Sequence, residues 1–294
     1  MKRNKLWMVA AAALIMMLTA CGHVTKEQKE QADQTMEAIR QSKEYDKMLL
    51  MADSLESLKW LSAAKAYYWR GYASDRLKDK EKAAEYWTKA MEAADQSRDK
   101  GDQEIYVKAA SRLANLLCIK GDYEGTLRVA QPVAKRLEEE KRDTTSDYEN
   151  LLIYIGCCQA VMGESVQEAE NNFDRAYKNH MENIERNHSD EAYKNAIAGL
   201  INIAYYCVFA KNYKYALYYT RHFGELLGEY EQRPGVSADY IDRQLGRYDI
   251  YKAQALKGLG KLEEAAEVFE AYQETRFSQT PEGQSLAEDY LSAE

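Results

Sequence analysis

One pattern of small and aromatic residues recurs along the chain. A small residue is followed about seven positions later by a turn, and a second small residue comes twelve positions after the first. An aromatic or small residue follows four positions later, and another comes three positions beyond it. The clearest copy has Gly71, Ala83, Trp87 and Ala90 at these four points. Recurrence of this kind is typical of repeat architectures, in which one structural unit is stacked many times.

The recurrence has a simple physical reading as paired helices. Two antiparallel helices joined by a tight turn pack closely only where one residue on each is small, and aromatic side chains fill the gap to the next pair. Because no pair buries its apolar face alone, successive pairs must stack. Five further copies are anchored by Ala253, Ala265, Phe269 and Tyr272; by Gly156, Ala169, Phe173 and Ala176; by Ala204 and Ala216; by Ala114, Thr126 and Ala130; and, most weakly, by Met36 and Met48.

Together these residues resemble the tetratricopeptide (TPR) repeat family over about residues 26–275. The resemblance implies an all-α fold, a right-handed superhelical solenoid of about five to six antiparallel helix pairs. The anchors of the second helices lie 35 to 49 residues apart, against about 34 in the family, so longer helices or added loops are expected. A helical bundle without repeats is the alternative.

The end of the chain predicts a helix that caps the last repeat. Thr280 suits the N-cap position, Pro281 the first helical position and Glu282 the positive end of the helix dipole. We expect this helix to end near Leu291. Further loops are predicted at 96–103, 142–147 and 231–236, of which the last, with its Pro-Gly step, is the best internal break.

The first twenty residues predict a signal peptide. A basic leader precedes an uninterrupted apolar run at 6–18, too short to span a bilayer comfortably but suited to a signal-peptide core. The run leads into Leu-Thr-Ala-Cys, ending at Cys21, which resembles the bacterial lipobox. The resemblance implies a diacylated Cys21 as the first residue of the mature chain. An ordinary signal peptide or a short anchor helix is the alternative.

These features predict the layout of the chain. Residues 1–20 form the signal peptide, 21–26 a lipidated tether and 27–294 the TPR-like repeat domain. We expect the lipid to hold the protein in the bacterial cell envelope, at the outer membrane. The net charge of −8 opposes binding to nucleic acid, because a negative surface repels phosphate backbones.

The remaining cysteines and the histidines show no spacing typical of a catalytic or metal site. Cys118, Cys157, Cys158 and Cys207 lie in apolar helical stretches, which favours buried free thiols. One disulfide between helices stays open, because the expected compartment is outside the cytoplasm. No motif for phosphate binding, metal binding or nucleophilic catalysis is found in the sequence. We therefore expect no catalytic site, no metal site and no cofactor.

The family resemblance implies that a partner binds the inner face of the superhelix, beside the small anchor of each first helix. In the middle of this face the corresponding residues are apolar, and they form either core or a groove for an apolar or helical peptide segment. The residues carried over by their offset from the anchors are Lys65, Tyr68, Tyr72, Asp75, Lys108, Ser111, Asn115, Asn150, Tyr205, Arg247, Gln254 and Lys257.

The function predicted from the sequence is a non-catalytic scaffold in the cell envelope that binds a protein or peptide partner. In layout the chain resembles TPR lipoproteins of outer-membrane assembly machines. Two alternatives remain: a glycan-binding outer-membrane lipoprotein, and a ligand-sensing accessory of an envelope signalling system. The tyrosines, 23 in all, give a little support to a binding surface, since tyrosine offers a large contact area with a polar tip.

Overall fold

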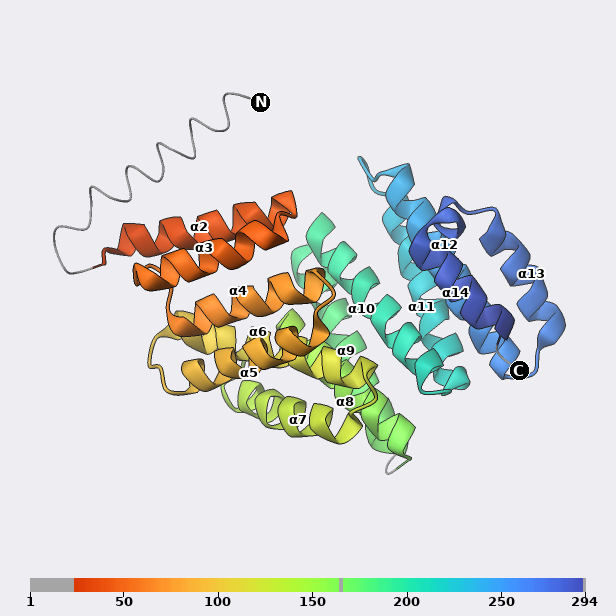
Figure 1. Ribbon diagram of the computed structural model, residues 1–294. Coiled ribbons are helices and arrows are strands. Elements are labelled where there is room, and N and C mark those ends of the chain that lie inside the picture. Colours follow the sequence, from red (N-terminus) through yellow and green to blue (C-terminus); the bar gives the residue numbers. More distant parts are fainter. Residues whose placement is uncertain (1–23, 164–165, 293–294) are drawn as a thin grey trace, which may run out of the picture. The chain divides into compact units, whose positions relative to one another are not determined.

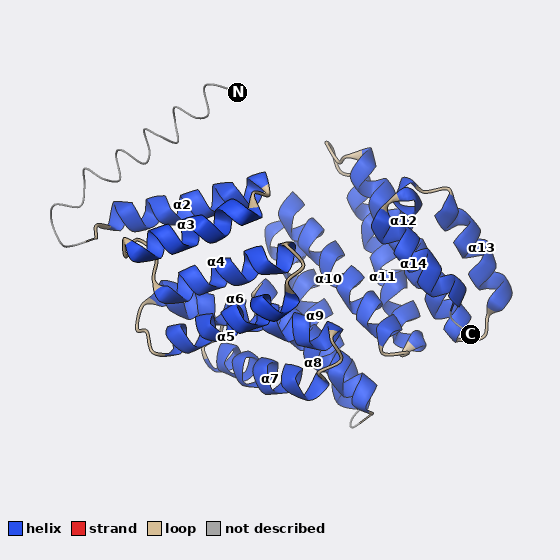
Figure 2. Ribbon diagram, viewed as in Figure 1, coloured by secondary structure: helices blue, strands red, loops and turns tan. Residues whose placement is uncertain are grey.

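A computed structural model describes residues 24–163 and 166–292 of the chain (Figure 1). Across these residues the structure consists of helices joined by short turns, without any β-strand (Figure 2). The predicted signal peptide and Cys21 lie outside the described residues. Within the described ranges, no helix combines the length and the apolar character needed to cross a membrane.

The chain divides into two compact units, residues 1–106 and 107–294. The described part of unit 1 holds two antiparallel helix pairs, and consecutive helices pack against each other. The long helix α6 contains the point of division. The helices of unit 1 are α2 (Lys26–Ser42), α3 (Tyr45–Ser57), α4 (Ala63–Arg76), α5 (Lys80–Asp95) and the first part of α6 (Lys100–Ile119).

Unit 2 continues the same plan from the second part of α6 and ends in a single helix that packs on α12. Figure 1 shows α12 and α14 side by side within this unit. Its remaining helices are α7 (Tyr123–Glu139), α8 (Ser146–Met162), α9 (Val166–Asn187), α10 (Asp190–Phe209), α11 (Tyr213–Glu231), α12 (Ala238–Gly258), α13 (Leu262–Gln273), the 3-10 helix η1 (Arg276–Gln279) and α14 (Pro281–Ser292).

Every one of the six copies of the sequence pattern corresponds to a helix pair, from α2–α3 to α12–α13. A β-carbon on Gly71 would lie 2.6 Å from the indole ring of Trp87 on the paired helix. On Gly156 it would lie 3.0 Å from both the carbonyl oxygen of Ala169 and the ring of Phe173. Close approach therefore requires the small residues, and the predicted pairing is confirmed.

The long spacing between repeats arises mainly from long helices. The helices α6, α9, α10 and α12 contain 20, 22, 20 and 21 residues, against 14 and 16 in the pair α4–α5. Extra helical turns lengthen each unit while the contact between small residues stays at its centre. The expected departure from the family period is thus confirmed as longer helices.

Side-chain caps begin several of these helices where the sequence places Ser, Thr or Asp. Ser62, Thr145 and Ser189 each accept a hydrogen bond from a backbone N–H in the first turn of α4, α8 and α10. Thr280 does the same for α14, where its Oγ1 accepts from the N–H of Gly283 at 3.0 Å. The predicted start of the last helix is confirmed.

Candidate functional site

In unit 2 the first helix of each helix pair lines a groove, which we name the inner groove. It has a volume of about 440 Å³ and is lined by residues of α6, α8, α10, α12 and α14. Its lining brings together three residues predicted to bind a partner, which are Asn115, Tyr205 and Arg247. The complete lining is Asn115, Ile119, Tyr154, Ala198, Ile201, Asn202, Tyr205, Tyr206, Arg247, Tyr251, Glu282 and Leu286.

Four tyrosine rings form a continuous row across this groove. Tyr154 of α8 meets Tyr206 of α10 edge to face, with ring centroids 5.5 Å apart. Tyr206 packs in the same way on Tyr205 at 5.0 Å, and Tyr205 lies 6.1 Å from Tyr251 of α12. Such aromatic pairs add stability beyond the area they bury. The row therefore joins three successive first helices.

The phenols of this row are hydrogen-bond donors at neutral pH. Burial raises the pKa of Tyr154, Tyr205, Tyr206 and Tyr251 above the ordinary value of 10.0, because the charged phenolate is poorly solvated there. The hydroxyl of Tyr206 donates to Oδ1 of Asn115 at 3.0 Å. The groove thus combines apolar walls with oriented polar groups, as small-ligand and peptide sites commonly do.

A second hollow of about 380 Å³ adjoins the inner groove and shares Tyr205 and Leu286 with it. Two further residues predicted to bind a partner, Gln254 and Lys257, line this hollow. The structure therefore gathers five of the twelve predicted residues along one connected surface. The rest of its lining is Val208, Phe209, Tyr213, Gly258, Asp289 and Tyr290.

Three of these five residues bind the last helix of the chain. The guanidinium of Arg247 donates to both carboxylate oxygens of Glu282, at 2.9 and 3.0 Å. The amide of Gln254 donates to the carbonyl oxygen of Leu286 at 3.3 Å, and Nζ of Lys257 donates to that of Tyr290 at 2.8 Å. The sequence predicted the capping helix but not that it would engage the predicted binding residues.

The four predicted residues of unit 1 are engaged in contacts within their own unit. Lys65 pairs with Asp33 at 2.6 Å, and Asp75 pairs with Lys80 at 2.5 Å. The rings of Tyr68 and Tyr72 are buried in the core. Burial favours the neutral phenol of Tyr72, but hydrogen bonds from Arg40 and Arg76 oppose it and leave the pKa lowered. These contacts leave the two tyrosines little surface for a partner.

The last three predicted residues lie in unit 2 without lining either hollow. Ser111 is buried, and Asn150 is half-buried near the start of α8. Lys108 is exposed on α6. Burial raises the pKa of Asp147, and Lys108 is among the cations that oppose this rise. A partner-binding role for these three residues stays a prediction.

Sequence reasoning missed several residues of the inner groove. Ile119, Asn202, Tyr206 and Tyr251 lie one to four positions from the nearest predicted residue, on the same first helices. Helical spacing contained a usable signal, because Asn115 and Ile119, four positions apart, share a face. Leu286 was missed for another reason, since its place in the groove depends on how α14 docks.

The sequence matches no protein-family model and no curated protein. Solved structures do share the fold. PilW, a widely conserved type IV pilus biogenesis factor, is 15% identical with a TM-score of 0.54, over 90% of this chain and 100% of PilW. A Rap protein complexed with competence and sporulation factor is 13% identical with a TM-score of 0.52, over 82% of this chain and 59% of that one.

A third structure carries the repeat name itself. The nearly identical TPR-like repeats of a Podosopora anserina putative kinesin light chain are 13% identical, with a TM-score of 0.50, over 71% of this chain and 92% of that one. At these identities the likeness concerns the fold alone. Together with the helix pairs described above, it establishes an all-α, TPR-like fold.

Proposed function

We propose that this chain is a non-catalytic lipoprotein of the bacterial cell envelope that holds a protein or peptide partner in its inner groove. The observation that carries the proposal is the groove itself, in which Asn115, Tyr205 and Arg247 meet around a row of tyrosines. Its side chains offer apolar area, hydrogen-bond donors and one arginine. That set suits recognition of a peptide segment.

The envelope location rests on the sequence of the first 21 residues. A basic leader, a short apolar core and the lipobox-like Leu-Thr-Ala-Cys occur there in the order that lipoprotein export requires. A lipid on Cys21 would hold the mature chain at the outer membrane, since several acyl chains together give stable attachment. The Rap structure offers a parallel for the binding role, because that protein of similar fold was solved as a complex with competence and sporulation factor.

Crosslinking from the groove tests the binding role. A photoreactive amino acid at Asn202, which lines the inner groove, should give a discrete adduct with one protein or peptide in living cells. The same amino acid at Lys178, which is 74% exposed on α9, is the matched control outside the groove. Mass spectrometry identifies the adduct.

The adduct from Asn202 should disappear when Tyr205→Ser removes one ring of the aromatic row, while circular dichroism shows an unchanged helix content. Equal adducts from positions 202 and 178, or an adduct indifferent to Tyr205→Ser, would contradict binding in the groove. The mass of the mature N-terminal peptide tests the anchor separately. An unmodified Cys21 would refute the lipoprotein assignment and leave the groove untouched.

Glycan binding is a second candidate, favoured by one observation. The ring of Phe209 is 39% exposed and stacks on Tyr205, with centroids 6.3 Å apart and an angle of 25° between the planes. Exposed, rigidly held rings are suitable platforms for sugar faces. Retardation on glycan affinity gels that is lost on Phe209→Ala, without a protein crosslink from Asn202, would favour this reading over the scaffold.

A further inference from the structure

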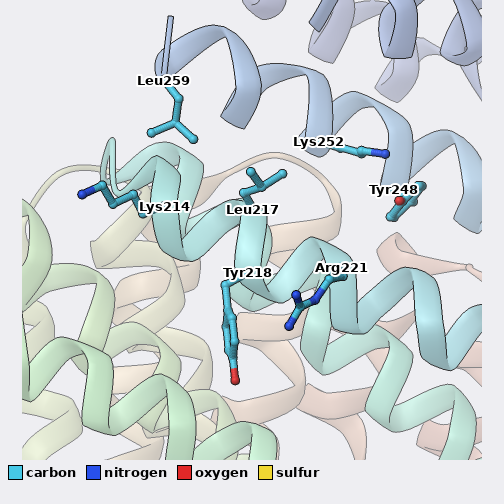
Figure 3. A pocket seen from close by; sticks show the side chains of 7 residues that line it. All are labelled: Lys214, Leu217, Tyr218, Arg221, Tyr248, Lys252 and Leu259. Atoms are coloured by element: carbon cyan, nitrogen blue, oxygen red, sulfur yellow. The ribbon is translucent and has the colours of Figure 1, made fainter. Parts of the chain in front are cut away.

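A second groove of unit 2 lies between α11 and α12, and we name it the α11–α12 groove. It has a volume of about 470 Å³ and shares no lining residue with the inner groove. In Figure 3, Lys214 and Leu259 lie toward one end, while Arg221, Tyr248 and Lys252 lie toward the other. Leu217 and Tyr218 complete the lining.

The charges along this groove are all positive. Its lining includes three cations and no acidic residue, in a chain that carries more acidic than basic residues overall. Within the described part of the chain, Lys214 and Lys252 form no ion pair, and Arg221 makes only a 3.7 Å contact with the exposed Glu225. An acidic ligand would therefore meet cations that are still available for pairing.

One acidic residue, Asp249, is close enough to the groove's Lys252 to interact with it. Asp249 follows Tyr248 on α12, and Lys252 acts on its carboxylate. Burial is the larger effect there and raises the pKa of Asp249 to about 6. Asp249 does not line the groove. Lys252 therefore interacts with the carboxylate of Asp249 from outside the groove's lining.

Two tyrosine rings of the lining each contact one of its cations. Nζ of Lys252 lies 5.3 Å from the ring centroid of Tyr248, and the guanidinium carbon of Arg221 lies 5.8 Å from that of Tyr218. Tyr218 is 43% exposed. Such cation–π contacts orient the cations without neutralising them.

The two helices that form the groove are held close to each other. A β-carbon on Gly224 of α11 would lie 2.7 Å from the ring of Tyr248, so this glycine admits the ring between the helices. Gly258 of α12 packs in the same way against the ring of Tyr213. Because both ends are closely packed, the groove between them is preformed and loses little entropy when a ligand binds.

We propose that the α11–α12 groove binds an extended acidic peptide segment of a protein partner. Lys214 and Arg221 are seven residues apart on α11, which corresponds to about 10 Å along the helix axis. A chain in the extended polyproline II conformation covers about this distance in three residues, and its threefold repeat places side chains three positions apart on the same face. The ligand is therefore a segment with two acidic side chains three positions apart and an apolar side chain between them, set against Leu217.

An acidic peptide suits this site better than an anionic membrane. The site is a groove with leucines and tyrosines in its lining, whereas binding to lipid headgroups requires a broad basic face. The chain as a whole has a net charge of −8, so it repels a broad anionic surface. The α11–α12 groove shares no lining residue with the inner groove, so its ligand can be tested independently of the function proposed above.

Fluorescence anisotropy of the full chain with a labelled probe peptide tests the proposal. The probe Gly-Ser-Glu-Leu-Ser-Glu-Ser-Gly has its glutamates three positions apart, and a matched probe carries glutamine in their place. The groove variant combines Lys214→Gln and Arg221→Gln. The control variant combines Arg128→Gln and Lys178→Gln, which remove the same charge from side chains that are 70% and 74% exposed on α7 and α9.

The glutamate probe should bind the wild-type chain with an affinity that falls as salt is added. Binding should weaken roughly tenfold in the groove variant, as expected for two exposed charge pairs, and stay within about twofold in the control variant. No saturable binding, equal binding of the glutamine probe, or equal loss in both variants would overturn the proposal. Phosphatidylglycerol vesicles that bind through Lys214 and Arg221, and displace the peptide, would assign the site to lipid instead.

Discussion

A buried acid–imidazole pair in unit 2 should make the stability of this protein depend on pH. Glu149 of α8 and His180 of α9 lie with Oε2 and Nδ1 3.2 Å apart, and each is only 5% exposed. His180 packs against Gly199 of α10, where a β-carbon would meet the imidazole ring. The pair is therefore enclosed by three helices and has little access to water.

Burial shifts both groups toward their neutral forms. It raises the pKa of Glu149 from 4.5 to about 8, with Arg186 opposing the rise, and lowers the pKa of His180 from 6.5 to about 4. Between these values the folded pair retains one proton and titrates as a unit. We place the proton on Glu149, whose carboxyl group donates it to Nδ1 of His180.

The pH window follows from comparing the folded and unfolded chains. The raised pKa of Glu149 contributes stability below about pH 4.5 that is lost as the pH rises toward 8. The lowered pKa of His180 contributes stability that is complete above about pH 6.5 and is lost as the pH falls toward 4. Between about pH 4.5 and 6.5 the two slopes cancel, so the net loss occurs from about 6.5 to 8. About 1.5 pH units at about 1.4 kcal/mol each give a loss of about 2 kcal/mol.

The substitution Glu149→Gln should remove this loss. The glutamine amide can still donate to Nδ1 of His180, but it has no proton to release. The control is Glu185→Gln, which makes the same substitution at an exposed position on α9. Urea unfolding at about pH 6.5 and about pH 8, followed by far-ultraviolet circular dichroism, gives the free energy of unfolding of each variant.

The tryptophans provide an internal reference for this measurement. Trp60, Trp69 and Trp87 all lie in unit 1, and the sequence of unit 2 contains no tryptophan. The change with pH should therefore occur in the dichroism transition and be absent from the tryptophan fluorescence transition. Equal loss of stability in the wild-type chain and in Glu149→Gln between these two pH values would refute the reasoning.

Three further predictions concern the helix contacts, the thiols and the last helix. Gly71→Ala should destabilise unit 1 by about 1–3 kcal/mol, because the new carbon meets Trp87; urea unfolding followed by tryptophan fluorescence would show it. Gly228→Ala in unit 2, with open space around it, should be neutral or stabilising by about 1 kcal/mol in unfolding followed by circular dichroism. The four buried cysteines should react slowly with an aromatic disulfide reagent in the folded chain and fully in urea, since hydrogen bonds between thiols, together with burial, raise the pKa of Cys118 and Cys158, and burial raises the pKa of Cys207; fewer than four reactive thiols in urea would indicate a disulfide. Glu282→Gln should speed hydrogen exchange of α14 several-fold through loss of the Arg247 pair, and unchanged exchange would show that this pair contributes nothing.

The fold was predictable because its main constraint is local in sequence. Helices that cross closely admit only a small residue at the contact, so Gly71 and Gly156 mark the contact points, with Trp87 and Phe173 opposite them. The spacing between partners is set by helix geometry and the turn, and both can be read from one chain. The weakest copy was also correct, since Met36 and Met48 are fully buried on paired helices.

The candidate site was only partly predictable, because it depends on contacts between distant elements. Offsets from the anchors selected Asn115, Tyr205 and Arg247, which line one groove in the structure, and their role in binding stays a prediction. The same offsets selected Tyr68 and Tyr72, whose rings are buried in unit 1. Offset alone fixes the helix face, whereas exposure depends on which aromatic rings of the next helices cover that face.

The four remaining cysteines also show that burial was predictable from the sequence whereas contacts between distant helices were not. Their apolar surroundings predicted buried free thiols, and all four are free and buried in the structure. No pattern in the sequence indicated that three of them meet: Sγ of Cys118 lies 3.7 Å from that of Cys157 and 3.9 Å from that of Cys158. Cys157 and Cys158 point to different faces of α8, yet one residue of α6 reaches both.

The docking of α14 bears on how a partner could enter the inner groove. Two separate sets of contacts hold this helix. On one side Phe269 stacks on Tyr290 at 4.2 Å, and the buried hydroxyl of Tyr272 donates to the carbonyl of Gly283 at 2.6 Å. On the other side Arg247 pairs with Glu282, whose side chain is 55% exposed.

These two sets differ in strength, and the difference favours a groove that can open locally. A partly exposed ion pair contributes at most about 1 kcal/mol, because water competes for both charges. A buried aromatic stack with a satisfied hydrogen bond contributes more, since its loss also exposes apolar area. A carboxylate from a partner can therefore replace Glu282 at Arg247 while Phe269 and Tyr272 keep α14 in place. Recognition at Arg247 then requires the exchange of one carboxylate for another, and not the unfolding of the cap.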